Sequence, residues 1–291
     1  MSISGRILLT GQAGFTGQHL SRIAAERGYE VIGLQSDLTD VQALTAEVVG
    51  KRYDYVVHLA AIAAVTHADQ NELYRVNLFG TLNMLNAVRA AGYTPAKMLV
   101  ASSANVYGNS TLSPLDENVV PAPVNHYAMS KLAMEHMVRA NSGELPLLFT
   151  RPFNYTGVGQ DERFLIPKLV QHFARRAPEI ELGNMQVERE FNDVRAVCGI
   201  YLDLLETGQP GETYNVCSGQ TYSLKQVLEM LGKMAGYTIK ARVNPQFVRA
   251  NEVHTLCGDP VRLASCIGPL KFSRLQDTLR WMLEAAPSDR P

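Results

Sequence analysis

Tyr127 and Lys131 are four residues apart, and their side-chain types suit proton transfer. A helix is expected over residues 125–141, because Pro121 and Pro123 prevent an earlier start and good helix formers follow. On a helix, side chains at this spacing lie on one face. A free phenol has a pKa of about 10, and a nearby ammonium lowers it, so that the Tyr exchanges a proton with an alcohol or ketone oxygen. The same spacing is common on surface helices, so its meaning depends on the rest of the chain.

A glycine-rich turn follows the first expected strand. Residues 6–10 form a short apolar run, and Gly11, Gly14 and Gly17 then precede a helical stretch that stops at Gly28. In such a unit the first glycine permits the tight turn, the second lets the backbone approach a pyrophosphate, and the third packs the helix on the strand. The helix N-terminus then faces the anion. The pattern predicts a dinucleotide site, although its G-x-x-G-x-x-G spacing differs from the usual G-x-G-x-x-G. A glycine turn without a ligand is the alternative.

The second expected strand, residues 30–34, leads into Gln35 and Ser36. An acidic residue at this place binds the adenosine ribose, and a basic one accommodates a 2′-phosphate. Gln35 and Ser36 carry neither charge. The sequence therefore leaves the choice between NADH and NADPH open.

Strands and helices alternate through residues 1–155. Beyond the first two, apolar strands are expected at 55–61, 97–102 and 145–150. This alternation predicts an α/β fold with a doubly wound (Rossmann) parallel sheet. Ligands of such sheets bind beyond the carboxyl ends of the strands, and Ser103 stands at such an end, although a serine there is often only a turn former. His58, inside its strand, is expected to be a core or strand-end histidine rather than a catalyst.

The second half of the chain has more polar loops between its helices and short strands. We expect a dinucleotide-binding domain of residues 1–155 with about 188–217, and a smaller C-terminal α/β domain of residues 156–187 and 218–291 that binds the substrate. Within the smaller domain, Ser223 and Gln226 have the spacing of a capping box that opens a helix.

Composition and charge exclude several function classes. Hydrophobic residues make up 46% and charged residues 19%, as in ordinary folded proteins, and the net charge of −1 gives no support for binding nucleic acid or a membrane surface. The four cysteines lack metal-ligand spacing and the density of a secreted disulfide scaffold, so reduced thiols and no metal site are expected. No apolar run approaches the roughly 18 residues of a membrane span, and we see no signal peptide. A cytoplasmic protein without a nucleic-acid or membrane partner is expected.

In this order, the glycine turn, Ser103, Tyr127 and Lys131 resemble the extended short-chain dehydrogenase/reductase superfamily, which contains nucleotide-sugar epimerases, dehydratases and reductases. Further matching stretches are residues 58–61, 77–83, 106–108, 151–154 and 214–219. The resemblance implies that Ser103, Tyr127 and Lys131 are catalytic. It also implies that NAD(P) is bound by Gly11, Gly14, Phe15, Thr16, Gly17, Asp37, Leu38, Leu59, Ala60, Ala61, Asn77, Tyr127 and Lys131.

Within the superfamily the chain most resembles the group containing GDP-mannose 4,6-dehydratase and GDP-4-keto-6-deoxymannose reductase. The stretches that carry this likeness are residues 153–160, 182–184, 189–191, 249–253 and 258–259. The resemblance implies that the substrate is bound by Ser103, Asn105, Asn154, Arg189, Arg249 and Glu252. Arg189 and Arg249 suit a diphosphate, because a guanidinium forms bidentate, charge-assisted hydrogen bonds with it. Asn154 would contact the same diphosphate, and Glu252 a ribose hydroxyl.

One position separates dehydratases from reductases in this superfamily. The dehydratases carry an acid two residues before the Tyr of a Tyr-Gly pair, whereas Asn105 stands two residues before Tyr107. An amide cannot accept a proton as a carboxylate does. We therefore expect NAD(P)H-dependent reduction of the C4 ketone of GDP-4-keto-6-deoxy-D-mannose to GDP-D-rhamnose or its C4 epimer, GDP-6-deoxytalose. A 4-epimerase or 4,6-dehydratase with tightly bound NAD, and a non-catalytic dinucleotide-binding regulator, are the alternatives.

The resemblance also implies a homodimer in which helices at residues 69–91 and 125–141 pair with their copies as a four-helix bundle. The chain departs from the group at three places: Glu190 replaces an Asp, Ala250 replaces a Pro, and residues 267–271 replace a Trp-Lys-Pro motif. These departures leave the sugar, the nucleotide base and the product stereochemistry more open than the chemistry.

Overall fold

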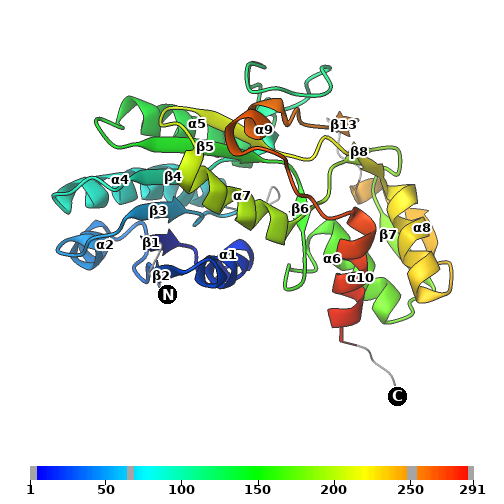
Figure 1. Cartoon of the computed structure of the whole chain (residues 1–291). Helices are drawn as coiled ribbons and strands as arrows, with labels where there is room; N and C mark the ends of the chain where they lie inside the picture. The colour runs from blue at the N-terminus through cyan, green and yellow to red at the C-terminus, as the bar shows by residue number, and fades with distance from the viewer. Residues whose placement is uncertain (1–4, 64–68, 248–253, 288–291) are drawn as a thin grey trace.

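The computed structural model describes residues 5–63, 69–247 and 254–287 (Figure 1). Six parallel strands form the central sheet, in the order β10-β5-β4-β3-β1-β2. They are β1 (Gly5–Thr10), β2 (Tyr29–Gly33), β3 (Tyr55–His58), β4 (Lys97–Ala101), β5 (Leu147–Pro152) and β10 (Thr213–Val216). Both faces are buried, and the inner strands are correspondingly apolar along their length: Ile7 and Leu9 pack on one side and Leu8 on the other. The predicted doubly wound parallel sheet is confirmed.

Helices cover both faces of this sheet, and each face has its own hydrophobic core. One face packs against α1 (Phe15–Glu26), α7 (Val194–Thr207) and α9 (Val261–Ile267). The other face packs against α2 (Val41–Val48), α4 (Thr81–Ala90) and α5 (His126–Ala140), as Figure 1 shows for the side that α4 and α5 occupy. Because the strands are parallel, all their carboxyl ends lie at one edge of the sheet.

The helix predicted over residues 69–91 is not regular. α3 (Gln70–Tyr74), capped by the Asp69 carboxylate, passes into a π-helical turn, η1 (Arg75–Gly80), before α4 begins. A Cβ on Gly80 would lie 2.9 Å from Cβ of Leu38, so the wide turn packs closely on the loop that follows β2. Such single π turns often occur at functional sites, and this one contains the buried Asn77.

A third hydrophobic core lies beyond the carboxyl edge of the sheet, among the elements to the right in Figure 1. It is formed by α6 (Leu165–Ala174), β7 (Glu179–Leu182), α8 (Leu224–Ala235), β12 (Lys240–Val243) and α10 (Leu275–Ala285), with β7 and β12 paired in parallel. The predicted capping box is confirmed, since Ser223 and Gln226 satisfy each other's backbone N–H groups at the start of α8. This core is separate from the two cores on the faces of the sheet.

Short elements join the two parts of the chain. β6 (Tyr155–Thr156) pairs with β9 (Asn192–Asp193), and β8 (Glu188–Arg189) lies between β11 (Tyr222–Ser223) and β13 (Thr255–Leu256). Two 3-10 turns complete the structure, η2 (Ala104–Tyr107) and η3 (Pro245–Phe247). The Asp193 carboxylate caps α7 and accepts a hydrogen bond from the Thr278 hydroxyl of α10 at 2.8 Å. This contact joins α10 to the start of α7. Within the described ranges, no helix is long and apolar enough to cross a membrane.

Candidate active site

The glycine turn between β1 and α1 has the geometry that a pyrophosphate needs. Gly11 has φ of +74°, and the Gly14 N–H donates to the Gly11 carbonyl at 3.0 Å. A Cβ on Gly17 would lie only 2.1 Å from that same carbonyl oxygen. In the described part of the chain no side chain caps α1 after Gly14, and the first turn of the helix carries no acid. The first N–H groups of α1 are therefore available to an anion, and the turn fits a dinucleotide.

The residues after Gly14 face the second part of the molecule. The ring of Phe15 stacks on Tyr155, with centroids 6.2 Å apart, and the Thr16 hydroxyl shares a hydrogen bond of 2.8 Å with the Tyr155 phenol. Burial raises the pKa of Tyr155 to about 12. Sequence reasoning did not select Tyr155. Its place beside the glycine turn makes it a neighbour of any dinucleotide bound there.

Two other predicted cofactor-binding residues, Asp37 and Leu38, lie in the loop after β2 and stabilise it. The Asp37 carboxylate accepts hydrogen bonds from the backbone and hydroxyl of Thr39, and these bonds lower the pKa of Asp37. The Leu38 side chain is buried in the core, while its carbonyl accepts a hydrogen bond from Asn83 at 2.9 Å. Both residues therefore shape the loop.

His58 is a core histidine, as predicted. Its side chain is buried, with Nδ1 2.8 Å from the Thr10 hydroxyl and Nε2 2.9 Å from the Thr81 hydroxyl. Thr81 donates its proton to the Asn77 carbonyl, so Nε2 must donate to Thr81; Thr10 accepts from the Ala60 N–H and donates to Nδ1. Burial lowers the pKa of His58 to about 3. The imidazole is neutral and holds the segment after β3.

That segment, which contains the predicted residues Leu59, Ala60 and Ala61, runs next to the glycine turn: a Cβ on Gly11 would lie 2.9 Å from the Ala60 nitrogen. The side chain of Asn77 fixes the residue that follows. Its Oδ1 accepts from the Ile62 N–H at 2.8 Å, and its Nδ2 donates to the Ile62 carbonyl. Asn77 thus acts through the backbone that borders the dinucleotide site.

Asn77 also connects this backbone segment to α5. Its Nδ2 lies 3.0 Å from the Ser130 hydroxyl, which donates to the Tyr127 carbonyl at 2.7 Å. Tyr127 stands in the first turn of α5, which begins sharply because Asn125 accepts the Ala128 N–H. The π turn and the start of α5 are therefore held in register.

Ser103, Tyr127 and Lys131 come together at the carboxyl edge of the sheet. Ser103 follows β4 and caps η2. All three residues are buried, each with an exposed fraction of 8% or less. Burial raises the pKa of Tyr127, and a hydrogen bond between its phenol and the Ser103 side chain acts in the opposite direction. The predicted lowering of the Tyr127 pKa by Lys131 is therefore wrong for the chain by itself, because burial dominates.

Lys131 has a different electrostatic role from the one expected. Its Nζ donates to the Ala101 carbonyl at 2.6 Å. Burial lowers the pKa of Lys131 to about 8, although the charge of Glu135, one turn later, acts to raise it. The amine is held at the end of β4, two residues before Ser103.

The position that distinguishes a dehydratase holds an amide in direct contact with the triad. Asn105 donates to the Ser103 hydroxyl oxygen twice, from Nδ2 at 3.0 Å and from its backbone N–H at 3.2 Å. With both acceptor positions of Oγ used, the Ser103 proton points outward. The Ser103 side chain also interacts with the Tyr127 phenol, and this interaction opposes the rise in the pKa of Tyr127.

The remaining predicted substrate residues are less completely placed. Asn154 follows β5, and its carbonyl accepts the Asn192 N–H at 2.9 Å. Arg189, on β8, donates through Nη1 to the carbonyls of Glu188 and His254 at 2.8 and 3.0 Å. Arg249 and Glu252 lie outside the described residues.

One buried carboxylate on the substrate side was noted in the sequence only as a departure from the family pattern. Glu190 accepts hydrogen bonds from the Asn192 amide, from the N–H and hydroxyl of Ser218, and from the Gly258 N–H. Burial raises the pKa of Glu190, and these four bonds oppose the rise. Glu190 ties β9 to the segments after β10 and β13. Glu190 stands among other charged residues, Glu188, Arg189 and Asp193, so the sequence gave no distinct signal for its buried role.

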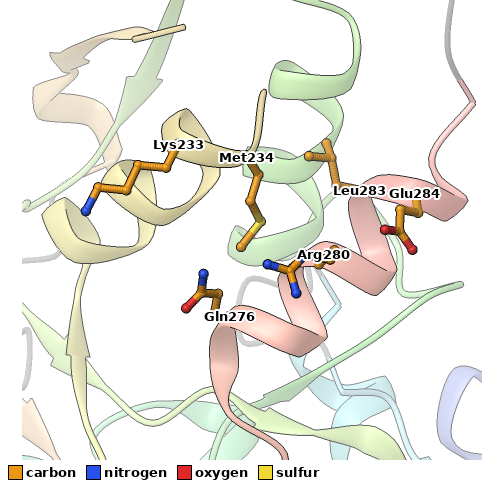
Figure 2. A pocket seen from close by; sticks show the side chains of 6 residues that line it. All are labelled: Lys233, Met234, Gln276, Arg280, Leu283 and Glu284. Atoms are coloured by element: carbon orange, nitrogen blue, oxygen red, sulfur yellow. The ribbon is translucent and has the colours of Figure 1, made fainter. Parts of the chain in front are cut away.

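A cavity of about 290 Å³ lies elsewhere, between α8 and α10 (Figure 2). Its lining is Lys233, Met234, Gln276, Arg280, Leu283 and Glu284. None of these belongs to the predicted site. Among the described residues, no group of three or more His, Cys, Asp or Glu side chains is arranged to hold a metal ion.

Comparison with known proteins agrees with this geometry. The chain is 34% identical over 268 residues to a GDP-6-deoxy-D-talose 4-dehydrogenase of Aggregatibacter actinomycetemcomitans, covering 90% of this chain and 91% of the relative. It is 33% identical to a GDP-6-deoxy-D-mannose reductase of Pseudomonas aeruginosa, covering 96% of both. A solved structure of RMD from Pseudomonas aeruginosa, complexed with NADPH, superposes with a TM-score of 0.89 at 32% identity, over 97% of this chain and 98% of that one.

A model of the NAD dependent epimerase/dehydratase family matches residues 7–217, which include the glycine turn, Ser103, Tyr127, Lys131 and the central sheet except the first two residues of β1. The resemblance predicted from the motifs is confirmed. The chain belongs to the NAD dependent epimerase/dehydratase family.

Proposed function

We propose that this protein reduces the C4 ketone of GDP-4-keto-6-deoxy-D-mannose to a GDP-6-deoxyhexose, using NAD(P)H. The names of the two curated relatives support the substrate class, since both act on GDP-6-deoxy sugars. The observation that carries the choice of reaction is the contact of Asn105 with Ser103, because it puts an amide where elimination of water requires a carboxylate.

The reduced dinucleotide, when bound at the glycine turn, supplies the hydride. The chain's own residues handle the oxygen of the ketone. Tyr127 donates a proton to it, and the raised pKa of Tyr127 keeps the phenol protonated at neutral pH, as a proton donor requires. Ser103, oriented by Asn105, donates a hydrogen bond toward the same place. Lys131, beside Ser103, is proposed to hold the nicotinamide ribose.

The substrate diphosphate is proposed to lie toward Asn154 and Arg189, with Arg249 and Glu252 as further contacts. Support comes from the position of Asn154 two residues after the end of β5, on the same sheet edge as Ser103 and Tyr127, and from its backbone contact with β9. The Glu190 hydrogen bonds hold the backbone next to Arg189.

We also propose a homodimer through η1, α4 and α5. Phe79, Met129 and Met137 are exposed by 56%, 49% and 44%, more than expected for apolar side chains of a free surface. A four-helix bundle with a second copy would cover them. The four cysteines are free thiols, which supports a cytoplasmic location.

The test is a reductase assay with freshly made GDP-4-keto-6-deoxy-D-mannose, once with NADH and once with NADPH, and NMR of the product to separate GDP-D-rhamnose from GDP-6-deoxytalose. Tyr127→Phe should lower turnover at least about 100-fold while dinucleotide binding persists. Tyr237→Phe is the matched control, because its phenol lies in the core around α6 and α8 and donates to the carbonyls of His172 and Ala177.

Three other outcomes each point elsewhere. Near-normal turnover of Tyr127→Phe would remove Tyr127 from the mechanism. Interconversion of C4 epimers by protein that retains bound NAD through purification, with no net consumption of reductant, would indicate a 4-epimerase. Dinucleotide binding without turnover of any GDP, UDP or dTDP keto-sugar would indicate a regulator.

A further inference from the structure

The loop after β2 is held by a carboxylate from a distant helix. Glu47, on α2, accepts the Gln35 N–H at 2.9 Å through Oε1. Its Oε2 accepts the Ser36 N–H at 2.8 Å and the Ser36 hydroxyl at 2.5 Å. One side chain therefore occupies both backbone donors and the hydroxyl of the two residues that directly follow Leu34.

This loop lies beside the glycine turn. The Leu34 N–H donates to the Leu9 carbonyl at 2.9 Å, so the ends of β1 and β2 are adjacent. A Cβ on Gly33 would lie 1.8 Å from Oε1 of Gln12, so the side chain of this turn residue contacts the end of β2 directly. In dinucleotide-binding sheets the adenosine ribose lies at the end of the second strand, next to the turn that holds the pyrophosphate. The Glu47 carboxylate therefore lies at the loop where a sheet of this kind places the adenosine ribose.

Glu47 is an anion at neutral pH. Burial alone would raise the pKa of Glu47, but the hydrogen bonds from Ser36 and Gln35, with the nearby charge of Lys51, lower it below its ordinary value. A 2′-phosphate brings about two further negative charges to a place where the backbone donors are already used. Arg75, another cation near this loop, is bound to Thr39 and Glu72.

We propose that Glu47 is the residue that selects NAD(H) over NADP(H) in this protein. The proposal rests on the proposed function, in which a dinucleotide binds at the glycine turn. A 2′-hydroxyl meets a carboxylate able to accept its hydrogen bond, whereas a 2′-phosphate meets like charge and occupied N–H groups. The sequence did not show this, because the acid is not next to the strand but on the following helix. The solved structure of the Pseudomonas relative contains NADPH, so we expect the two proteins to differ in their preferred dinucleotide.

The experiment is isothermal titration calorimetry with NADH and with NADPH, at low and at high salt, on the wild type, on Glu47→Gln and on Glu30→Gln. Glu30→Gln is the matched control: it removes the same charge from the start of β2, where Glu30 pairs with Arg6 at 3.1 Å. The wild type should bind NADH at least about tenfold more tightly than NADPH, a difference of about 1.4 kcal/mol. Glu47→Gln should bind NADPH at least about tenfold more tightly than the wild type does, and Glu30→Gln should behave as the wild type.

Salt provides a second readout that needs no variant, since higher ionic strength should narrow the gap between the two dinucleotides in the wild type. Equal or tighter binding of NADPH by the wild type overturns the proposal, as does an unchanged NADH-to-NADPH ratio in Glu47→Gln or a gap that salt does not alter. Failure of both dinucleotides to bind would instead overturn the proposed function itself.

Discussion

Replacing Arg151 by Met should destabilise the protein severely, because it leaves a buried carboxylate without its partner. Arg151, on β5, forms a two-bond ion pair with Glu135 of α5: Nε to Oε1 is 3.0 Å and Nη2 to Oε2 is 2.7 Å. The two side chains are exposed by only 7% and 3%, so water screens the pair little. The third nitrogen donates to the Tyr107 phenol at 3.1 Å. This pair fixes α5 to the sheet one turn beyond Lys131.

Breaking a buried pair by removing one partner costs about 3–5 kcal/mol, whereas replacing both partners with apolar groups costs far less. We therefore expect Arg151→Met to lower the free energy of unfolding by about 3–5 kcal/mol and the double variant with Glu135→Leu to recover most of it. Arg242→Met is the control, because the Arg242–Glu179 pair is exposed by 55% and 46%. An exposed pair contributes at most about 1 kcal/mol.

The measurement is urea unfolding followed by circular dichroism, on the wild type, both single variants, the double variant and the control. A double-mutant cycle gives the interaction energy between the two side chains. The reasoning fails if Arg151→Met costs no more than Arg242→Met, or if the double variant is as unstable as the sum of the single ones. Either result would mean that Glu135 does not depend on Arg151.

Two further changes test the supports of the dinucleotide site. The pKa of His58 is about 3 in the folded chain and about 6.5 in the unfolded chain. Below about pH 6.5 the unfolded chain therefore binds a proton that the folded chain does not. The free energy of unfolding should decrease as the pH is lowered from about 6.5 to 3, and the loss at pH 5 should be about 2 kcal/mol. His58→Asn should lose this part of the acid sensitivity in urea unfolding at pH 7.5 and 5, and an equal loss in both proteins would contradict the assignment. Gly17→Ala puts a Cβ 2.1 Å from the Gly11 carbonyl oxygen and should open the turn. We expect the free energy of unfolding to fall by about 1–3 kcal/mol and the affinity for NADH, measured by calorimetry, to fall at least about tenfold. Unchanged affinity would show that the turn does not bind the dinucleotide.

The main elements of the fold could be predicted because their signals are local. Continuous apolar runs predict the buried parallel strands, and the glycine turn and the proline-limited start of α5 fix where helices begin. The π turn η1 could not be predicted in this way. It depends on the contact of Gly80 with Leu38 and on the hydrogen bonds of Asn77 to Ile62 and Ser130, all of which join residues distant in sequence.

The positions of the triad residues could be predicted, but their electrostatics could not. Ser103 is at a strand end and Tyr127 and Lys131 are one helical turn apart, so spacing is enough to bring them to one edge. The pKa of Tyr127 depends on its burial, and that of Lys131 on its burial and on Glu135. Burial at the junction of two cores is a property of the assembled fold, so the sequence pattern alone gave the wrong sign for Tyr127.

Asn105 bears on the proposed reaction in two ways, through its lack of a carboxylate and through its hydrogen bonds to Ser103. Its Nδ2 and its backbone N–H donate to the Ser103 oxygen, and this leaves the serine proton free for an acceptor beside the Tyr127 phenol. An aspartate at the same position would be an acceptor and would draw the serine proton toward itself and away from the phenol. An amide in place of the acid that dehydration needs therefore also leaves the Ser103 proton available for donation, which agrees with the ketone reduction proposed for this site.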